Sequence, residues 1–461
     1  MIANTPGHTA KLSEFLSTLR LDSVPPRVVE RAKDLVLDHL GVALHSANLP
    51  WSKIVRDYAD ATGDKAESTL YGRSEKVGRR VAALANGTAA HGIELDDTHD
   101  ESFSHPGTVV IPAALAVAEA RNATGRDFLT AVIAGYEAQC RTGAGATAAM
   151  SKGFHGTAVS GVFGATAATA SLLKSSGAQL ESAFGLAVSM ASGVMQFTED
   201  PEGNMVKRLH GGLPAHNGIL AAELAVAGLR GPREGIEGRY GFVRMFAHSD
   251  DASRVTRNLG ASWEIDQISV KLYACCRMFH AFIDAIRECR NDSGVRTEEI
   301  ESAEIVGPQM LLEGRMQYRP RSVMSAQYSL PYAVAATLLL EPRDPRSFSE
   351  ESMTRPDVLA VMDKVTGTAD PELDRLLPAK YPGGVRFKLR GGRVVARTLF
   401  DSVGTPERPL DREGITGKFR TLTSGCADTR LQEKIAAAVF ALEQDDGVAR
   451  LTALLRECRA E

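Results

Sequence analysis

The chain is poor in the features that mark secreted, zinc-binding and nucleic-acid-binding proteins. It has 6 cysteines among 461 residues and no Cys-x-x-Cys pair, which argues against a disulfide framework and a structural zinc site. It has no excess of positive charge, because 53 Lys and Arg stand against 57 Asp and Glu. We therefore expect neither nucleic acid nor an acidic membrane surface as a partner.

Long, strongly apolar runs are also missing. The longest uncharged stretches, residues 155–173 and 183–198, are rich in Ala, Gly, Ser and Thr and are too weakly apolar to span a membrane. The N-terminal residues lack the basic segment followed by an apolar one that marks a signal peptide. We therefore expect a cytoplasmic protein whose small-residue stretches are buried helices.

Apolar residues recur at intervals of three and four over the first half of the chain, which is the period of an amphipathic helix. The pattern predicts a helix at residues 26–44 and further helices near 80–91, 108–121, 127–141, 156–174, 178–197 and 214–228. This part of the chain should form an all-helical domain with fully buried central helices.

The pattern changes near residue 264. Segments 264–273 and 300–308 have apolar residues at every second position, and 385–400 alternates on both sides of Gly391-Gly392, which is typical of a β-hairpin. Helices are predicted between them at 277–290 and 326–340, so residues 264–402 read as a smaller α+β module. The tail from residue 429 is helical again, and periodicity alone does not decide which part it packs against.

The densest polar cluster lies at residues 94–105. It comprises Glu94, Asp96, Asp97, Thr98, His99, Asp100, Glu101 and His105. Because it lies between two predicted small-residue helices, we expect a loop. Carboxylates beside histidines can carry out general acid–base chemistry or bind a divalent metal, and a solvated acidic loop that caps the next helix has the same composition. Spacing does not separate the three.

A locally basic segment follows at residues 207–216. It contains Lys207, Arg208 and His210, and no acidic residue occurs from Met205 to Ala222. Such a segment ahead of a buried helix can hold a substrate carboxylate at the helix N-terminus. A solvated basic turn is the alternative.

Two further motifs contain titratable residues. His155 lies between glycines at the start of a small-residue helix, where a lone histidine is more often structural than catalytic. The segment KLYACCRMFH at 271–280 contains Lys271 and Arg277, which suit anion binding, together with a cysteine pair that we do not expect to act as a nucleophile.

Together these motifs resemble the MmgE/PrpD family, which contains 2-methylcitrate dehydratase, cis-aconitate decarboxylase and iminodisuccinate epimerase. The resemblance rests on five segments in order: HGIELDDTH with the following His105-Pro106, GFHGTAVSGVFGATAATA, KRLHGGLPAHNG, KLYACCRMFH and AQYSLPYAVA. It implies a mainly α fold in which residues 1–263 and 403–461 form a large all-helical domain and 264–402 an inserted α+β lid. It also implies a homodimer without a cofactor or metal, with its active site between the domains.

The resemblance also implies a set of site residues. The catalytic residues would be Asp97, Thr98, His105, His155 and Lys207. The substrate-binding residues would be Glu94, Arg208, His210, Lys271, Cys276 and His280. The chain departs from the family pattern where Glu94 replaces a common Asp and where Leu272 and Ala274 replace prolines. One extra residue also separates Thr98 from His105, and the longer acid and the longer loop change the reach of the pocket.

The family's reactions share the development of negative charge on a carbon beside a carboxylate, which nearby cations and an acid–base group stabilise. We expect a lyase that dehydrates a 2-methylcitrate-like polycarboxylate, with Lys207 and Lys271 at the carboxylates. His105 and His155 would move the proton, and the Asp97 carboxylate would orient an imidazole. The alternatives are decarboxylation of a cis-aconitate-like acid, epimerisation of a substituted succinate, a metal-dependent hydro-lyase, and a non-catalytic anion-binding helical dimer.

Overall fold

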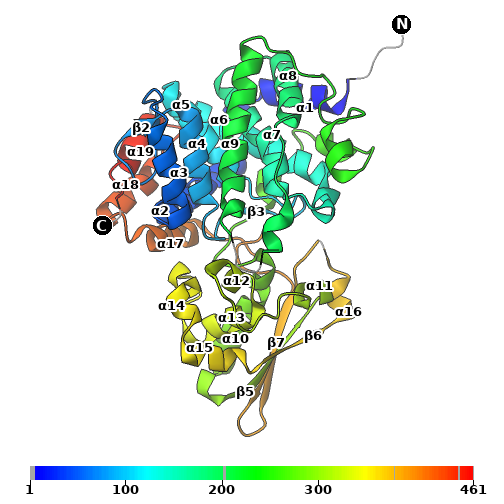
Figure 1. Cartoon of the computed structure of the whole chain (residues 1–461), viewed down its shortest axis with the longest axis vertical. Helices are drawn as coiled ribbons and strands as arrows, with labels where there is room; N and C mark the ends of the chain where they lie inside the picture. The colour runs from blue at the N-terminus through cyan, green and yellow to red at the C-terminus, as the bar shows by residue number, and fades with distance from the viewer. Residues whose placement is uncertain (1–5, 201–203, 378, 445–446, 460–461) are drawn as a thin grey trace.

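The computed structural model describes residues 6–200, 204–377, 379–444 and 447–459, and these build two hydrophobic cores. The larger core contains residues between 12 and 270 together with residues between 415 and 458. The smaller core is built mainly from residues 272–389. Figure 1 shows the corresponding regions one above the other, with the helical region on top and the region that contains the sheet below. The predicted fold class, mainly α with a smaller α+β part, is confirmed.

The larger region is made of helices. Its N-terminal helices are α1 (His8–Thr18), α2 (Pro26–Ser46), α3 (Pro50–Ala61), α4 (Arg79–Ala90), α5 (Gly107–Ala120), α6 (Gly125–Gly145), α7 (Gly156–Leu172), α8 (Gly177–Val188) and α9 (Val206–Val226). Helix α7 is buried along almost its whole length between α6 and α9. Small residues permit this: a Cβ on Gly218 of α9 would lie 2.4 Å from the Cβ of Ala165 on α7.

The C-terminal tail packs on this helical region. It forms α17 (Arg412–Thr423), α18 (Thr429–Phe440) and α19 (Gly447–Leu455). Phe419 and Ile435 belong to the larger core, and a Cβ on Gly41 of α2 would lie 3.2 Å from the Cα of Phe419. Helices α2 and α17 therefore approach closely although they are far apart in the sequence.

The smaller region contains a four-stranded sheet in the order β6-β5-β7-β8. The strands are β5 (Ile300–Gly307), β6 (Val365–Ala369), β7 (Gly383–Leu389) and β8 (Val394–Leu399). Strands β7 and β8 form the predicted hairpin, in which Lys388 pairs with Val394 and both turn glycines have positive φ, 88° and 86°. Strand β6 pairs with β5 in parallel and was not predicted.

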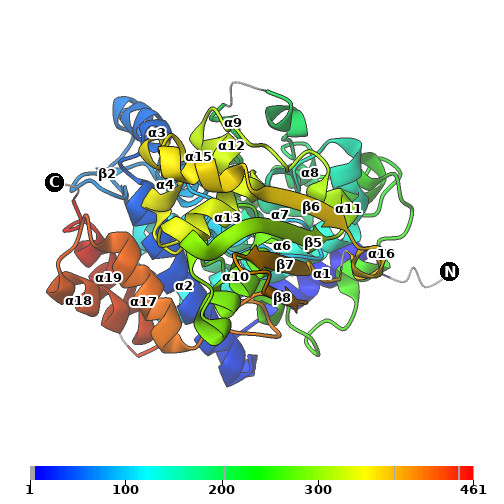
Figure 2. The ribbon, with the colours of Figure 1, turned by 90° about the horizontal axis from the view of Figure 1, so that it is seen from below.

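Helices complete the smaller region. They are α10 (His280–Ser293), α11 (Gln309–Leu312), α12 (Val323–Gln327), α13 (Leu330–Leu339), α14 (Glu350–Met353), α15 (Pro356–Met362) and α16 (Pro371–Asp374). Helix α10 packs against β7, β8 and α13. Figure 2, seen from below, shows the sheet lying across the helical region.

Four predicted elements differ from the structure. The helix expected at 326–340 is interrupted between Gln327, where α12 ends, and Leu330, where α13 begins. The helix expected at 178–197 ends at Val188, and the strand expected at 264–273 is only the two-residue β4 (Ile268–Ser269). The helix expected from 214 begins at Val206, because Gly212 serves close packing and not a turn. A Cβ there would lie 2.0 Å from the carbonyl oxygen of Leu84 on α4.

The state of the cysteines and the apolar character of the helices can be compared with the expectations from composition. All six cysteines are free thiols. Within the described ranges, no helix combines the length and the apolar character that crossing a membrane requires.

Candidate active site

The polar loop between α4 and α5 is held at the junction of the two regions by a short strand. Strand β3 (Thr98–His99) pairs with β4, Thr98 opposite Ser269. This pairing brings the residues that follow β4, including Lys271, beside the carboxylates that precede β3. The loop residues Glu94, Asp96 and Thr98 and also Lys271 are buried.

Glu94 joins three cations from different parts of the chain. Its carboxylate accepts hydrogen bonds from Lys207 and, at 2.9 Å, from Arg208 on the first turn of α9, and the Nζ of Lys271 lies 3.6 Å away. Burial raises the pKa of Glu94, but the three cations outweigh it and hold that pKa well below its ordinary value. Glu94 is therefore an anion that positions cations.

Asp96 binds two imidazoles. The Nδ1 atoms of His91 and His105 lie 2.7 Å and 3.3 Å from its Oδ2, and the Nζ of Lys271 lies 3.4 Å from Oδ1. Burial raises the pKa of Asp96, but the neighbouring His105, Lys271 and His91 outweigh it and hold that pKa well below its ordinary value.

Four histidine rings lie together beside these ion pairs. The ring centroids of His91 and His105 are 5.1 Å apart, those of His91 and His155 5.7 Å, and those of His155 and His210 5.1 Å. The Nδ1 atoms of His155 and His210 are 3.1 Å apart. We refer to the assembly as the site cluster, which comprises His91, Glu94, Asp96, His105, His155, Lys207, Arg208, His210 and Lys271.

The imidazoles of the site cluster are neutral at neutral pH. Burial lowers the pKa of His105 to about 3 and that of His210 to about 4. Burial, with the neighbouring positive charges, also lowers the pKa of His155 well below its ordinary value. A neutral imidazole accepts a proton when an anion enters.

Hydrogen bonds define the tautomers of two histidines. The Nδ1 of His105 lies 2.8 Å from the backbone oxygen of Asp97, and a carbonyl oxygen only accepts, so Nδ1 donates and Nε2 is the basic nitrogen. The Nδ1 of His91 likewise donates to the carboxylate of Asp96. In the part of the chain that the structure describes, four buried side-chain atoms here lack a hydrogen-bond partner: His91 Nε2, Asp96 Oδ1, Thr98 Oγ1 and Lys271 Nζ.

Asp97 takes a different role from the one expected. Its carboxylate accepts hydrogen bonds from the backbone N–H of Gly107 at 2.8 Å and from the hydroxyl of Tyr136 at 2.6 Å, and it reaches His105 only through its backbone oxygen. The carboxylate that binds the imidazoles is that of Asp96, because neighbouring residues of an extended loop face opposite sides. Burial raises the pKa of Asp97 to about 7.

The two residues expected from the lid side are less directly connected. The backbone N–H of Cys276 donates to the carbonyl oxygen of Gln327 at 2.9 Å. The ring of His280 packs edge-on against Tyr273, with centroids 5.0 Å apart. Among the described residues, neither side chain forms a hydrogen bond or an ion pair with the site cluster. Of the residues predicted from the sequence, the structure brings Glu94, His105, His155, Lys207, Arg208, His210 and Lys271 together.

Four residues that contact the predicted ones were not among the expected site residues, although Asp96 was named in the polar cluster. His91 and Asp96 belong to the site cluster, the hydroxyl of Tyr328 accepts a hydrogen bond from Lys207 at 3.0 Å, and the side chain of Gln327 lies 3.1 Å from Arg208. All four lie within the motifs HGIELDDTH and AQYSLPYAVA, which was the available signal.

One group of side chains has the spacing of metal ligands, and it lies outside the site cluster. His99, Glu101 and Glu264 place ligand atoms within 4.8 Å of one another. Arg254 already donates to both carboxylates, at 2.7 Å to Glu101 and 2.8 Å to Glu264. Since a guanidinium occupies these oxygens and would repel a cation, we assign no metal to them.

Comparison with known proteins agrees with the motifs. Family models match residues 10–255, described as the MmgE/PrpD N-terminal domain, and residues 273–444, described as the MmgE/PrpD C-terminal domain. The chain belongs to the MmgE/PrpD family. A cis-aconitate decarboxylase of Aspergillus terreus is 30% identical over 97% of this chain and 96% of its own length. The human cis-aconitate decarboxylase is 27% identical over 97% of this chain and 94% of its own length.

Proposed function

We propose that the chain is a lyase that decarboxylates cis-aconitate or a closely similar tricarboxylic acid. The observation that supports this most is the site cluster, in which three cations share two buried carboxylates beside four neutral imidazoles. The names of the relatives favour decarboxylation over the dehydration that we expected from the motifs.

Decarboxylation of such an acid needs charge stabilisation and a proton. When carbon dioxide leaves the saturated arm, the electrons of the broken carbon–carbon bond remain as an allylic carbanion. The charge spreads to the alkene carbon beside another carboxylate. A proton added at that carbon gives the product, so each turnover consumes one proton. Cations at the remaining carboxylates lower the barrier because the charge develops beside them.

The site cluster has residues for both tasks. Lys207 and Lys271 are the cations for the substrate carboxylates, with Arg208 holding Glu94 in place. The entering anion raises the low pKa of an imidazole, which then takes up a proton from water. His105 or His155, protonated in this way, donates that proton to the carbanion and returns to the neutral state in which it began.

The test is turnover of a panel of acids, with products followed by NMR and carbon dioxide measured directly. We expect cis-aconitate to release carbon dioxide and to yield a dicarboxylate with one carbon fewer. Consumption of 2-methylcitrate without carbon dioxide would identify a dehydratase, and loss of configuration in a substituted succinate would identify an epimerase. Binding without any turnover would identify the anion-binding dimer.

We also propose that the reaction needs no metal or organic cofactor, since side chains of the site cluster supply the charge and the proton. Metal analysis of the purified protein and assay after dialysis against a chelator test this. Activity that is lost to the chelator and restored by one ion would contradict it.

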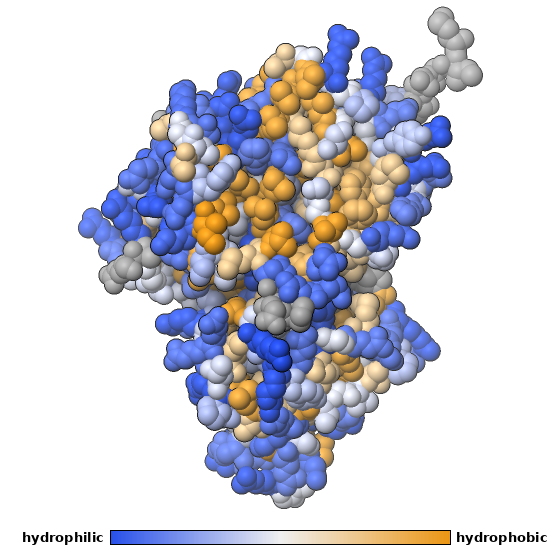
Figure 3. Space-filling model, in the orientation of Figure 1, coloured by the Kyte–Doolittle hydropathy of each residue, from blue (hydrophilic) through white to orange (hydrophobic). Residues whose placement is uncertain are grey.

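We further propose a cytoplasmic homodimer whose protomers meet at α9. Exposed apolar residues lie at both ends of this helix, at Met205, Val206, Val226 and Leu229. Figure 3 shows apolar side chains gathered on the face where α9 lies in Figure 1. Light scattering should give twice the 49.4 kDa of one chain, and a single-chain mass would contradict the proposal.

The domain boundaries predicted from the family, 1–263 with 403–461 and 264–402, are retained as part of this proposal. The presence of two hydrophobic cores supports the division into two parts, with the larger core extending past residue 263 to Val270.

A further inference from the structure

A pocket opens directly beside the site cluster. Its volume is about 510 Å³, and it is lined by residues 197–200 from the helical region and by residues between 315 and 328 from the α+β region. Two of its wall residues also contact the site cluster. Phe197 packs edge-on against the rings of His155 and His210, at 5.5 and 5.7 Å, and Tyr328 accepts a hydrogen bond from Lys207. The inner wall of the pocket is therefore in contact with the site cluster.

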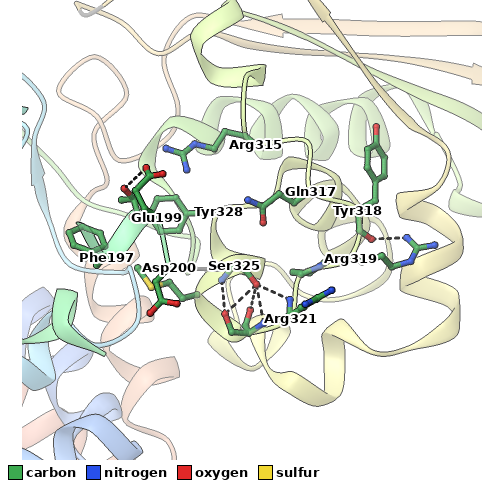
Figure 4. A pocket seen from close by; sticks show the side chains of 14 residues that line it. Phe197, Glu199, Asp200, Arg315, Gln317, Tyr318, Arg319, Arg321, Ser325 and Tyr328 are labelled. Atoms are coloured by element: carbon green, nitrogen blue, oxygen red, sulfur yellow. Dashed lines mark hydrogen bonds between the residues drawn. The ribbon is translucent and has the colours of Figure 1, made fainter. Parts of the chain in front are cut away.

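Arg315 projects into this pocket and stacks on its inner wall. Its guanidinium carbon lies 5.1 Å from the ring centroid of Tyr328, and Figure 4 shows the side chain beside Tyr328 and near Glu199. In the described ranges, the guanidinium of Arg315 forms no ion pair and no hydrogen bond. Arg319, in the same pocket, is held by both oxygens of Asp363 at 2.8 and 3.0 Å.

An unpaired guanidinium beside a concentrated set of cations requires a physical reason. Like charges repel, and Lys207 lies 5.5 Å from the same ring centroid on which Arg315 stacks. The two cations are therefore at most about 11 Å apart, with an aromatic ring to stabilise both. Such an arrangement is favourable when an anion joins them.

A tricarboxylate has the dimensions to do so. A five-carbon chain with a hydrogen-bonded cation at each end spans roughly 10–12 Å. The site cluster offers Lys207 and Lys271 to two neighbouring carboxylates, but Glu94 and Asp96 already neutralise much of its positive charge. The third carboxylate of the substrate therefore binds most favourably to a cation outside the site cluster.

We propose that Arg315 binds the third carboxylate of the substrate and so makes the enzyme selective for tricarboxylates over dicarboxylates. This inference rests on the proposed function, because it assumes that the polycarboxylate binds at the site cluster. The planar guanidinium matches a carboxylate by two parallel hydrogen bonds, and its stacking on Tyr328 fixes the plane. The contact is made before and during the reaction, so it strengthens binding of substrate and transition state alike.

The experiment compares two unreactive probes by calorimetry: propane-1,2,3-tricarboxylate, and succinate, which carries only the neighbouring pair of carboxylates. Arg315→Ala should weaken binding of the tricarboxylate by about 10- to 100-fold and leave the affinity for succinate unchanged. Arg315→Lys should recover part of the loss. Arg319→Ala is the matched control, because this arginine is already engaged by Asp363, and it should bind both probes as the unmodified protein does.

Kinetics with cis-aconitate give the second measurement. Arg315→Ala should raise KM and leave kcat nearly unchanged, as expected for an interaction made equally in the ground and transition states. Unchanged tricarboxylate binding in a folded Arg315→Ala protein, or an equal loss for both probes, overturns the proposal.

The outcomes separate the two proposals. Binding of the tricarboxylate that depends on Arg315, without release of carbon dioxide from cis-aconitate, refutes the proposed reaction and leaves the assignment of Arg315 in place. Release of carbon dioxide from cis-aconitate, with tricarboxylate binding unchanged in Arg315→Ala, supports the proposed reaction and refutes the assignment of Arg315. Absence of binding for both probes in the unmodified protein refutes both.

Discussion

Two clusters of charged residues include side chains of the loop between α4 and α5, and they differ in how completely their members are paired. The arginine network, which comprises Glu101, Glu137, Arg141, Arg254 and Glu264, gives every carboxylate an arginine partner. Arg141 binds Glu137 at 2.7 Å, and Arg254 binds Glu101 and Glu264. The site cluster instead contains imidazoles in mutual contact and a buried lysine whose Nζ makes no hydrogen bond in the described ranges.

This difference distinguishes an ion-pair network that stabilises the fold from a cluster that binds a ligand. Buried charges that are fully paired have no capacity left for a ligand, and their removal exposes a desolvation cost. Buried groups with open hydrogen-bonding capacity are costly until a ligand satisfies them, so they mark a binding site. Substitutions in the site cluster should therefore affect turnover, whereas substitutions in the arginine network should affect stability.

The largest expected effect on turnover is that of His105→Asn. The amide can keep the hydrogen bond to the backbone oxygen of Asp97 but cannot carry a proton, so kcat on cis-aconitate should fall by about 10²–10⁴-fold. Thermal melts should show a folded protein. His45→Asn is the control, since His45 also contacts a backbone oxygen, that of Leu422 at 3.1 Å, outside the site. A His105→Asn protein with normal kcat would leave His155 as the proton donor.

The largest expected effect on stability is that of Arg141→Met. Arg141 and Glu137 are fully buried, and Arg141 also donates to the backbone oxygens of Arg257 and Ser262. Leaving Glu137 unpaired should lower the free energy of unfolding by about 3–5 kcal/mol, with kcat per folded molecule unchanged. Denaturant titration and active-site counting measure the two quantities.

The double variant Glu137→Leu with Arg141→Met sharpens this comparison. Removing both charges should recover part of the lost stability, because no uncompensated charge remains. If Arg141→Met instead lowers kcat as strongly as His105→Asn does, the arginine network takes part in the reaction and the distinction between the two clusters fails.

Lys207→Ala should have the next largest effect. Glu94 keeps its bond to Arg208 at 2.9 Å, so the fold should survive. The loss of one cation at the developing charge should lower kcat by about 10²–10³-fold. Lys33→Ala is the matched control, because Lys33 is also buried and paired, with Glu30 and Glu443, but lies away from the site. Near-normal kcat/KM in a folded Lys207→Ala protein would reduce the ion pair with Glu94 to a structural one.

The features of the fold and the site that could be predicted from the sequence are those that depend on neighbouring residues in the chain. The buried helices followed from periodicity, and Lys207, His105 and Lys271 followed from motifs. Strand β6 was missed because only Val365 of its five residues is buried and its parallel partner is distant in the sequence. Arg315 lies in no motif, and its place in the pocket depends on the approach of two regions.

The choice between Asp96 and Asp97 was not predictable for a related reason. Which carboxylate faces the histidines depends on the path of the loop, and Glu94 sets that path with a φ of 56°. Non-glycine residues rarely adopt this conformation, and here three cations around the Glu94 carboxylate offset its cost. Sequence spacing contains no information about such a reversal.

The smallest expected effect is the uptake of a proton when an anion binds. Burial holds the pKa of His105 at about 3 and that of His210 at about 4 in the free protein, so both are neutral at pH 7. A bound tricarboxylate raises these values. Between the free and the bound pKa the complex holds more protons than the free protein, so affinity should fall as pH rises, by at most about tenfold per pH unit for one proton.

Calorimetry of propane-1,2,3-tricarboxylate in buffers of different ionisation enthalpy measures this uptake between pH 7 and 8.5, where the carboxylates of the ligand stay ionised. We expect a fraction of one proton, reduced in His105→Asn if that imidazole is the acceptor. The guanidiniums of the arginine network stay protonated throughout this range and do not contribute. Burial raises the pKa of Glu137 in that network to about 7, so the double variant Glu137→Leu with Arg141→Met is the control that removes its carboxyl group. Tight binding with no uptake and no dependence on pH would mean that the imidazoles stay neutral in the complex. The proton consumed in each turnover would then have to come from a group outside the site cluster.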